Sequence, residues 1–397
     1  MSDTMGQLSW LEGGAERSAQ WRSESGWPAP KKVVVADDTM NADTAYRLAL
    51  EGTALLWRGD FQNARQLLSA LVRRVEHKSD RARRAKAGKG AAKGGAQTPS
   101  ELFHRHRLQQ LQRARTLAML LIPFDAGHVI PLRRAPDVRE ACLEAYGPAD
   151  APYVASLREL LGVIGAHEWR RKGVRIPSLD ANIHPWYGVF SPVRGEYVEL
   201  VAQAPLPQGA AGTKLAFDIG AGTGVLSAVL ARRGVQRVLA TDMDARALGC
   251  ARENIARLGL AAQVDIVQAD LFPEGRAALV VCNPPWLPGK PSSAIEYAIY
   301  DPDSRMLKGF LGGLAQHLEP GGEGWLILSD LAEHLGLRTR EQLLGWITAA
   351  GLNVIARHDV RPTHGKASDP DDPLHAARSR EVTSLWRLRE NPAAKTE

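Results

Sequence analysis

The chain has 397 residues, of which 44% are hydrophobic and 24% are charged. This composition is typical of a globular protein with two or three domains and excludes a disordered, collagenous or coiled-coil chain. Three widely separated cysteines, Cys142, Cys250 and Cys282, form no CxxC pair, so we expect neither a disulfide framework nor a metal site. The apolar run 117–122 is too short for a bilayer, and residues 1–4 do not resemble a signal peptide. We therefore expect a soluble, cytoplasmic protein.

The formal net charge of +6 comes from one segment. Between Lys78 and Thr98 the basic residues Lys78, Arg81, Arg83, Arg84, Lys86, Lys89 and Lys93 stand against Asp80 alone, and the rest of the chain is balanced. This segment is rich in Ala, Gly, Lys and Arg and has no apolar side chain larger than Ala. The composition predicts a flexible basic linker over residues 78–100.

The regions on either side of this linker have mostly helical patterns. Residues 1–40 are polar and are interpreted as a loosely held arm, whereas residues 41–77 have apolar side chains every three to four positions and predict a helical hairpin. Residues 101–176 contain further helical stretches and are interpreted as a helical region for substrate recognition. The N-terminal region is thus expected to be mostly helical.

From residue 177 to 397, β-branched runs alternate with helical patterns. Strands are expected at 214–219, 237–242, 264–268, 278–282, 324–329, 353–357 and 382–388, with helices at 223–233, 245–259, 305–318 and 338–350. This alternation predicts an α/β, Rossmann-like, doubly wound and mostly parallel seven-stranded sheet. No helix separates the last two strands, so the last strand is expected to be antiparallel.

The ends of the first three strands carry glycines and carboxylates. The first strand leads into Asp218-Ile219-Gly220-Ala221-Gly222-Thr223-Gly224, directly before a helix. Glycines allow close approach of a ligand, and the helix start offers N–H donors, but the GxGxG spacing argues against a dinucleotide. Asp242 ends the second strand, where a carboxylate can accept both hydroxyls of a ribose, and Asp270 follows the third. Together these strand ends predict a nucleoside cofactor.

The fourth strand leads into Asn283-Pro284-Pro285-Trp286. With the glycine loop, this tetrapeptide resembles the class I S-adenosylmethionine-dependent methyltransferases that carry Asn-Pro-Pro-aromatic, the small-domain and HemK-like amino-methyltransferases, over about residues 185–389. The resemblance implies S-adenosyl-L-methionine as cofactor and a methyltransferase domain over 177–397. It implies these cofactor-binding residues: Asp218, Gly220, Ala221, Gly222 and Gly224 toward the methionine part, Asp242 and Met243 at the ribose, Asp270 and Leu271 at the adenine, and Asn283.

The tetrapeptide suits transfer of a methyl group to a planar nitrogen, whose lone pair is delocalised. The Asn283 side-chain oxygen and the Pro284 carbonyl can accept both N–H groups, so that the lone pair faces the methyl group. The Pro284 and Pro285 rings fix the backbone that aims these acceptors, and Trp286 can stack on the target. We interpret Asn283, Pro284, Pro285 and Trp286 as the catalytic residues, with no acid or base required.

A segment before the sheet is a candidate wall of the site. The resemblance implies that such a segment covers the cofactor, which makes Phe190, Pro192, Arg194 and Glu196 candidates for the substrate wall. The alternative is a plain helix start with Arg194 and Glu196 in solvent.

Three functions stay open. The first is methylation of the exocyclic amine of an RNA or DNA base, favoured by Trp286 as a stacking platform and by the basic segment as a phosphate anchor. The second is a HemK-like protein glutamine N5-methyltransferase, favoured by the helical region before the catalytic domain, although Trp286 stands where Tyr is expected. The third is a non-catalytic assembly factor that binds S-adenosylmethionine. We favour the first, with an RNA or ribosome-associated substrate and with no membrane or metal partner.

Overall fold

The computed structural model describes residues 6–88, 97–207, 214–291, 294–363 and 369–392, and it describes their side chains except at 78–88 and 294. The chain divides into two compact units. The first comprises Met1–Gln97 and His104–Glu168, and the second comprises Thr98–Phe103 and Trp169–Glu397.

The first unit contains a six-stranded mixed sheet in the order β1-β2-β6-β5-β4-β3. Strands β3, β4 and β5 are parallel, whereas β6 runs antiparallel to β5, and β1 and β2 form an antiparallel hairpin. The strands are β1 (Gln7–Glu12), β2 (Ala15–Trp21), β3 (Lys32–Ala36), β4 (Thr53–Trp57), β5 (Leu120–Phe124) and β6 (Tyr153–Ser156). The helices are α1 (Ala42–Leu50), α2 (Phe61–Gly88), α3 (Pro99–Leu117), α4 (Arg139–Tyr146) and α5 (Leu157–Lys172), of which α3 and α5 continue into the second unit.

The predicted polar arm over residues 1–40 is wrong, because this stretch supplies three strands. Leu8 and Trp10 alternate with exposed neighbours and are buried, which is the period of a strand with one covered face. Gly13 and Gly14 both have positive φ values, 61° and 80°, as a two-residue hairpin turn requires. Both signals of a hairpin, the Gly-Gly turn and the two-residue apolar period, are present in the sequence and could have indicated these strands.

The predicted mostly helical N-terminal region is also wrong. The expected helical hairpin over 41–77 contains the fully buried strand β4 between α1 and α2, and the region 101–176 contains β5 and β6. A short continuous apolar run, such as Thr53–Trp57, has no period of its own, so a buried strand looks like part of a neighbouring helix.

The predicted basic linker over 78–100 is partly helical. Helix α2 continues to Gly88, and α3 begins at Pro99, while residues 89–96 lie outside the described part. Ala, Lys and Arg have high helix propensities, and no Pro or Gly interrupts the chain between Phe61 and Ala87. Extending an existing helix needs no new nucleus, so these residues remain helical without apolar anchors.

The second unit contains the predicted seven-stranded sheet, in the order β11-β10-β9-β12-β13-β15-β14. Neighbouring strands are parallel from β11 to β13, and the last strand, β15, runs antiparallel to both β13 and β14, as predicted. The strands are β9 (Leu215–Ile219), β10 (Arg237–Asp242), β11 (Val264–Gln268), β12 (Ala277–Cys282), β13 (Leu318–Ser329), β14 (Leu352–Val360) and β15 (Thr383–Glu390). The small hairpin β7 (Val174–Ile176) and β8 (Ala181–Ile183) precedes them.

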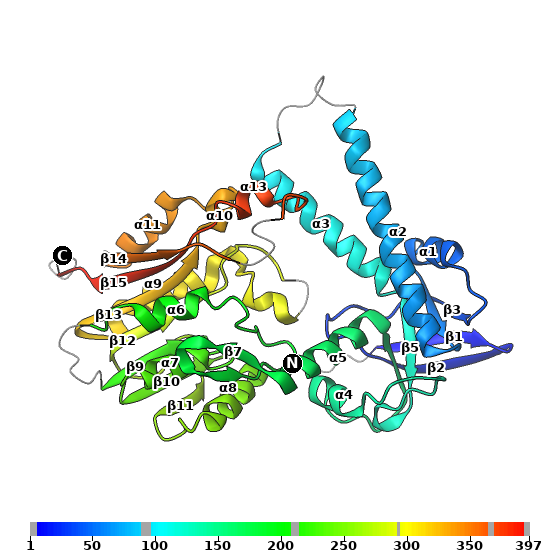
Figure 1. Ribbon diagram of the computed structural model, residues 1–397, viewed down its shortest axis with the longest axis horizontal. Helices are drawn as coiled ribbons and strands as arrows, with labels where there is room; N and C mark the ends of the chain where they lie inside the picture. Colours follow the sequence, from blue (N-terminus) through cyan, green and yellow to red (C-terminus); the bar gives the residue numbers. More distant parts are fainter. Residues whose placement is uncertain (1–5, 89–96, 208–213, 292–293, 364–368, 393–397) are drawn as a thin grey trace. The chain divides into compact units, whose positions relative to one another are not determined.

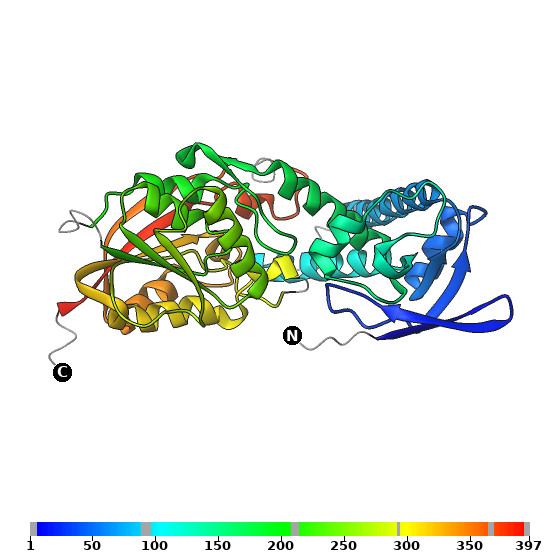
Figure 2. The ribbon, with the colours of Figure 1, turned by 90° about the horizontal axis from the view of Figure 1, so that it is seen from below.

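Helices cover both faces of this sheet (Figures 1 and 2). One apolar core contains residues of α6, α7 and α8, and a second core on the opposite face contains residues of α9 and α11. The helices are α6 (Glu196–Gln203), α7 (Val225–Arg232), α8 (Ala245–Arg257), α9 (Arg305–His317), α10 (Leu331–His334), α11 (Arg340–Ala349) and α13 (His375–Arg378). This is the doubly wound arrangement predicted for the sheet.

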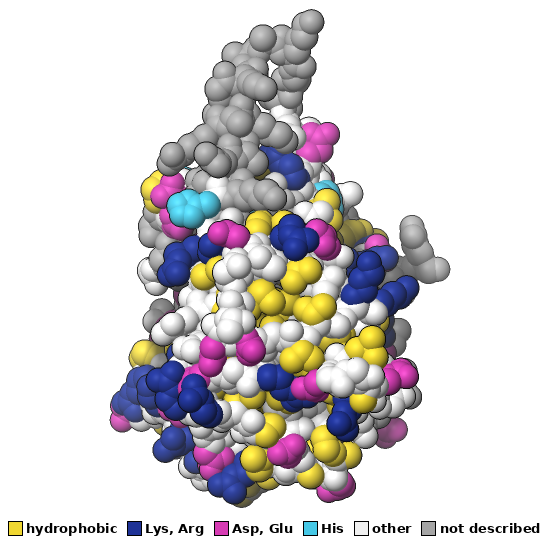
Figure 3. Space-filling view, turned by 90° about the vertical axis from the view of Figure 1, so that its right-hand side faces the viewer, with side chains coloured by type: hydrophobic (Ala, Val, Ile, Leu, Met, Phe, Trp, Pro, Cys, Tyr) yellow, Lys and Arg dark blue, Asp and Glu magenta, His cyan; other side chains and the backbone are white. Residues whose placement is uncertain are grey.

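The surface of the first unit carries apolar side chains. Leu11 and Leu143 are exposed, and Figure 3 shows one face of the molecule on which apolar side chains gather. In the part of the chain that the structure describes, no helix is both long and apolar enough to cross a bilayer.

A buried carboxylate links β13 to β15. Glu323 is 1% exposed and accepts hydrogen bonds from Nε and Nη2 of Arg387 at 2.8 and 2.9 Å. Nη2 of Arg389 donates a further bond at 2.9 Å. Burial alone would raise the pKa of Glu323, but the bonds from Arg387 and Trp325 lower it.

We expect Glu323→Ala to destabilise the second unit by about 3 kcal/mol, because it leaves the mostly buried Arg387 guanidinium without its partner. Glu319→Ala, an exposed position of the same strand, is the control and should change the free energy of unfolding by less than about 0.5 kcal/mol. Chemical denaturation followed by circular dichroism measures both values. Equal losses in the two variants would contradict the prediction.

Candidate active site

The glycine loop between β9 and α7 is fixed by the end of β10. The amides of Gly220 and Ala221 both donate to the carbonyl of Thr241, at 2.9 and 2.8 Å. Gly220 and Gly222 have positive φ values of 80° and 54°. A Cβ at Gly220 would lie 2.8 Å from Cε of Met306, whereas a Cβ at Gly222 would meet nothing within 4 Å. The positive φ values therefore favour glycine at both positions, and the backbone at 222 faces open space.

Asp242 lies beside this loop at the end of β10. Its Oδ2 accepts a hydrogen bond from the Gly222 amide and its Oδ1 accepts one from the Asp244 amide, both at 3.0 Å. Burial raises the pKa of Asp242, and these backbone bonds partly offset the shift. The carboxylate is thus held in one orientation, and Met243 next to it is 55% exposed.

Asp218 lies inside the fold, in β9. It is 1% exposed, and Oγ of Ser227 in α7 donates to its Oδ2 at 2.5 Å. Burial raises the pKa of Asp218 to about 6, although the hydrogen bonds from Ser227 act in the opposite direction. This carboxyl group therefore ties the strand to the helix that follows the glycine loop.

The end of β11 places Asp270 and Leu271 at the same edge. Nη2 of Arg305, at the start of α9, lies 2.5 Å from Oδ2 of Asp270, and both side chains are at least half exposed. Leu271 has a positive φ of 72°, and its carbonyl accepts a hydrogen bond from Oγ1 of Thr241 at 2.5 Å. No spacing in the sequence indicates a role for Arg305, because it lies far along the chain and in another element.

The tetrapeptide 283–286 follows β12, which pairs with β9. The register matches Cys282 with Ile219, so Asn283 and Gly220 are the next residues at the ends of two neighbouring strands. The indole Nε1 of Trp286 donates to Oδ1 of Asn283 at 2.9 Å. This bond, which we did not predict, orients the Asn283 amide and leaves its oxygen one further acceptor site. Trp286 packs against the apolar cores of both faces and is half-buried.

The predicted wall segment lies between β8 and α6. Pro192 is buried, while Phe190 and Glu196 are partly buried, and α6 begins at Glu196. Nη1 of Arg194 lies 3.8 Å from Oε1 of Glu381, which also accepts a hydrogen bond from Oγ of Ser329 at the end of β13. Arg194 is therefore tied to the carboxyl edge of the sheet.

Asp301 is a residue of this region that we did not identify from the sequence. It is 5% exposed, and its two oxygens accept hydrogen bonds from the amides of Met306 and Leu307 at 3.0 and 3.1 Å. Its own amide donates to the carbonyl of Leu287, directly after the tetrapeptide. Asp301 therefore fixes the start of α9 next to Trp286, and no spacing in the sequence marks this long-range contact.

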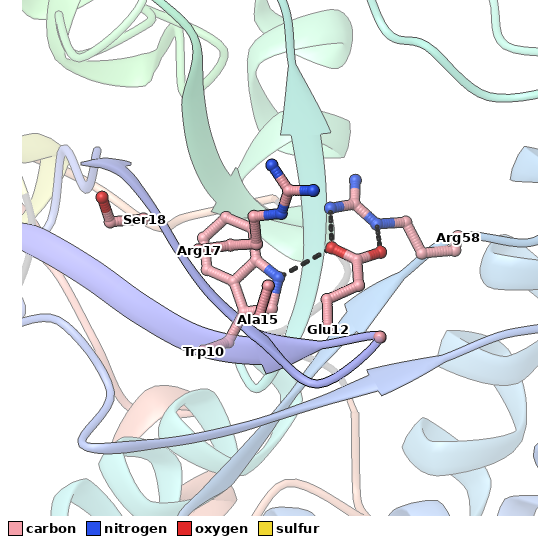
Figure 4. A pocket seen from close by; sticks show the side chains of 7 residues that line it. Trp10, Glu12, Ala15, Arg17, Ser18 and Arg58 are labelled. Carbon is pink, nitrogen blue, oxygen red and sulfur yellow. Dashed lines mark hydrogen bonds and ion pairs between the residues drawn. The ribbon is translucent and has the colours of Figure 1, made fainter.

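Two further features bear on where a ligand can bind. Among the described residues, no group of three or more His, Cys, Asp or Glu side chains could hold a metal ion. In the first unit, Figure 4 shows a shallow hollow lined by the β1–β2 hairpin and by Arg58. Its Glu12 carboxylate is already bonded to Arg58 and Trp10. The strand ends of the second unit therefore remain the candidate site.

These strand ends fit S-adenosyl-L-methionine. The open space at Gly222 accommodates a ligand against the backbone, and the fixed Asp242 carboxylate suits the hydroxyls of a ribose. The order of the sheet, with its antiparallel last strand, and the glycine loop at its carboxyl edge define the class I methyltransferase fold.

The comparisons relate this chain to the small-domain methyltransferases. Residues 188–339 match the family described as "Methyltransferase small domain", which confirms the predicted relationship to small-domain methyltransferases. The chain is 32% identical over 161 residues to a release factor glutamine methyltransferase of Cereibacter sphaeroides, covering 37% of this chain and 54% of that protein. It is 29% identical over 187 residues to a tRNA1(Val) (adenine(37)-N6)-methyltransferase of Shewanella loihica, covering 44% and 72%.

A third relative matches over a shorter stretch. The chain is 46% identical over 69 residues to a ribosomal protein L11 methyltransferase of Pelotomaculum thermopropionicum, covering 17% of this chain and 22% of that protein. The chain therefore spans about half the length of the first of these relatives and a fifth of the third.

The buried Asp218 gives a pH-dependent prediction. Its folded-state pKa of about 6 is above the value of 3.8 for an unburied carboxyl group, so the folded protein binds this proton more tightly. The raised pKa therefore stabilises the folded protein below about pH 4, and this contribution is lost as the pH rises through 6. Asp218→Asn removes the titration, so its stability relative to the parent should rise by roughly 2–3 kcal/mol from pH 4 to pH 7.

Denaturation at several pH values, without cofactor, measures this difference. Asp265→Asn is the matched control, because this carboxylate on β11 is about half exposed and should give a nearly constant difference. A pH-independent difference for Asp218→Asn would contradict a raised pKa at Asp218.

Proposed function

We propose that this protein is an S-adenosylmethionine-dependent N-methyltransferase that methylates a planar amino or amide nitrogen, and that its substrate is the exocyclic amine of an RNA or DNA base. The observation that carries the proposal is the adjacent placement of Gly220 and Asn283, with the Asn283 oxygen already oriented by Trp286. A cofactor at the glycine loop and a nitrogen at Asn283 would then meet at one edge of the sheet.

The residues proposed for the cofactor have distinct tasks. Asp242 would accept the ribose hydroxyls, and the backbone around Gly220 and Gly222 would contact the methionine part. Asp270 and Leu271 would border the adenine, with Asp270 shared between Arg305 and the ligand. When bound, S-adenosylmethionine supplies an electrophilic methyl group on a sulfonium.

The residues proposed for the substrate orient one nitrogen. Asn283 Oδ1 and the Pro284 carbonyl accept its two hydrogens, which aims the lone pair and needs no catalytic base. Pro284 and Pro285 restrict the backbone that carries these acceptors. Trp286 provides an aromatic surface for the planar group and holds Asn283 in position.

Two substrate classes have support among the relatives. The adenine N6-methyltransferase of Shewanella loihica supports a nucleic-acid base, and we favour it because of the basic segment at the end of α2. The glutamine methyltransferase of Cereibacter sphaeroides supports protein glutamine as the second candidate. A non-catalytic assembly factor is the third reading. For the first two substrates we propose that the protein acts in the cytoplasm.

One experiment separates these substrates. The protein is incubated with cell extract and with S-adenosylmethionine that is radiolabelled in its methyl group. Label that nuclease releases supports the RNA or DNA base, and label that only protease releases supports glutamine. Cofactor binding without transfer to either fraction would support the non-catalytic reading.

We expect two variants to separate binding from chemistry. Asp242→Ala should weaken S-adenosylmethionine by about 1.5–3 kcal/mol, because it removes charge-assisted hydrogen bonds to the ribose. Asn283→Ala should retain the affinity for S-adenosylmethionine and lower kcat by about 100-fold or more, because the nitrogen is no longer oriented. Calorimetry and single-turnover methylation measure the two effects.

Trp286→Phe is the matched control for Asn283→Ala. It keeps an aromatic ring but removes the N–H that holds Asn283. Because the Asn283 oxygen remains, Trp286→Phe should lose much less turnover than Asn283→Ala. Equal losses would mean that Asn283 only anchors Trp286, and full activity of Asn283→Ala would overturn the proposed mechanism.

The basic segment tests the RNA proposal. Lys78, Arg81, Arg83, Arg84 and Lys86 lie on the helical extension of α2. With about four contacts to single-stranded RNA, the affinity should fall about 50-fold between 50 and 200 mM salt. Replacing these five residues with Gln should flatten this dependence and leave S-adenosylmethionine binding unchanged.

The control replaces Arg252 and Arg257 on α8 with Gln, which changes charge without changing the basic segment. Binding of fluorescent RNA at several salt concentrations gives the slopes. If the five-residue variant keeps the slope of the parent, the segment is a solubilising element, and protein glutamine becomes the favoured substrate.

A further inference from the structure

Arg338 is a buried cation with unused hydrogen-bonding capacity. It lies between α10 and α11 and is 3% exposed. Its Nε and Nη2 have no hydrogen-bond partner in the described part of the chain. Burial lowers its pKa. Because nearly all buried polar atoms in proteins are paired, two unpaired nitrogens on one buried guanidinium need an explanation.

The carboxylates whose charges act on Arg338 accept hydrogen bonds from other donors. Glu333 and Asp301 both act to raise the Arg338 pKa, so both lie near it. The two oxygens of Glu333 accept from Nε of Arg340, at 2.8 and 2.9 Å. Those of Asp301 accept from the backbone at the start of α9. Nε and Nη2 of Arg338 thus have carboxylates nearby but donate no hydrogen bond to them.

The two unpaired nitrogens form one edge of the guanidinium. In two other arginines of this protein the same edge donates two parallel hydrogen bonds to a carboxylate. Nε and Nη2 of Arg58 both bond Glu12 at 2.8 Å, which Figure 4 shows, and those of Arg387 bond Glu323. This edge matches two oxygens of a carboxylate or a phosphate. Among the residues that the structure describes, this edge of Arg338 has no such acceptor.

Arg338 lies next to the residues that follow the tetrapeptide. Its amide is 3.4 Å from the carbonyl of Ala332, and Ala332 shares an apolar cluster with Leu287. Leu287 also accepts the amide of Asp301. Burial raises the pKa of Cys282, and the charges of Asp218 and Asp301 raise it further, which places Asp301 near the end of β12. These links place Arg338 near the residues that follow the tetrapeptide.

We propose that Arg338 is a substrate-binding residue whose Nε and Nη2, which are covered in this structure, become accessible on substrate binding and bind two oxygens of an RNA phosphate beside the target nucleotide. This inference rests on the proposed function and adds a contact that positions the base at Asn283. Phosphate is favoured over a protein carboxylate because the basic segment, which supplies the whole net charge of +6, suits a polyanion.

The test compares three variants with a fluorescein-labelled, 20-nucleotide single-stranded RNA of mixed sequence. Arg338→Lys keeps the charge but removes the paired Nε and Nη2 donors. It should therefore weaken RNA binding about 10-fold with an unchanged salt slope. Arg338→Met should weaken it further and reduce the salt slope by about 0.7. Arg340→Lys, whose Nε is already bonded to Glu333, is the control and should bind RNA as the parent does.

A second measurement excludes a merely structural role. Because Arg338 is buried and incompletely paired, Arg338→Met should raise the unfolding temperature without RNA, by about 2–4 °C. If Arg338 were instead hydrogen bonded to an acceptor of the protein itself, Arg338→Met would remove that bond and the unfolding temperature would fall. A lower unfolding temperature with unchanged RNA affinity would overturn the proposal.

The outcomes also separate this inference from the proposed function. If the parent methylates RNA and Arg338→Lys binds and methylates it equally well, only the role of Arg338 fails. If the parent binds no S-adenosylmethionine and methylates neither RNA nor protein, the proposed function fails. If the parent methylates protein, and Arg338→Lys raises KM for an acidic peptide, the phosphate is replaced by a carboxylate and the RNA inference is overturned.

Discussion

The parallel pairing of β9 with both of its neighbours is the constraint on which the candidate site depends. Its register matches Ile219 with Thr241 on one side and with Cys282 on the other. A slip by one residue would turn the buried side chains of β9 to the opposite face, so the two cores fix this register. Because the register is fixed, the glycine loop, Asp242 and Asn283 follow three adjacent strands at one edge.

The same register explains why much of this site could be predicted from the sequence. Parallel strands joined by helices must end at one edge, so a glycine loop, a carboxylate and an Asn-Pro-Pro turn that follow successive strands converge there. The bond from the Gly222 amide to Asp242 is one result. The first unit could not be predicted in this way, because Thr53–Trp57 and Leu120–Phe124 are short, fully buried runs without a period.

The contacts that the sequence did not reveal are made by side chains from loops and helix ends. Trp286 was expected to stack on a substrate, yet its N–H also orients Asn283. Asp270 was expected to face the cofactor, yet it forms an ion pair with Arg305. Neither partner is set by strand register. Each depends on the path of a loop after the strand, which spacing alone does not determine.

Charge is distributed unequally along β13 and its neighbours. In the amino-terminal half of β13, the buried Glu323 is bonded by Arg387 and Arg389, and these bonds lower its pKa. Beyond the carboxyl end, one oxygen of Glu381 accepts a hydrogen bond from Ser329, its other oxygen has no hydrogen-bond partner among the described residues, and burial raises its pKa. Because a buried oxygen without a hydrogen bond destabilises a fold, Glu381 is a stability cost at this edge that suits a binding site.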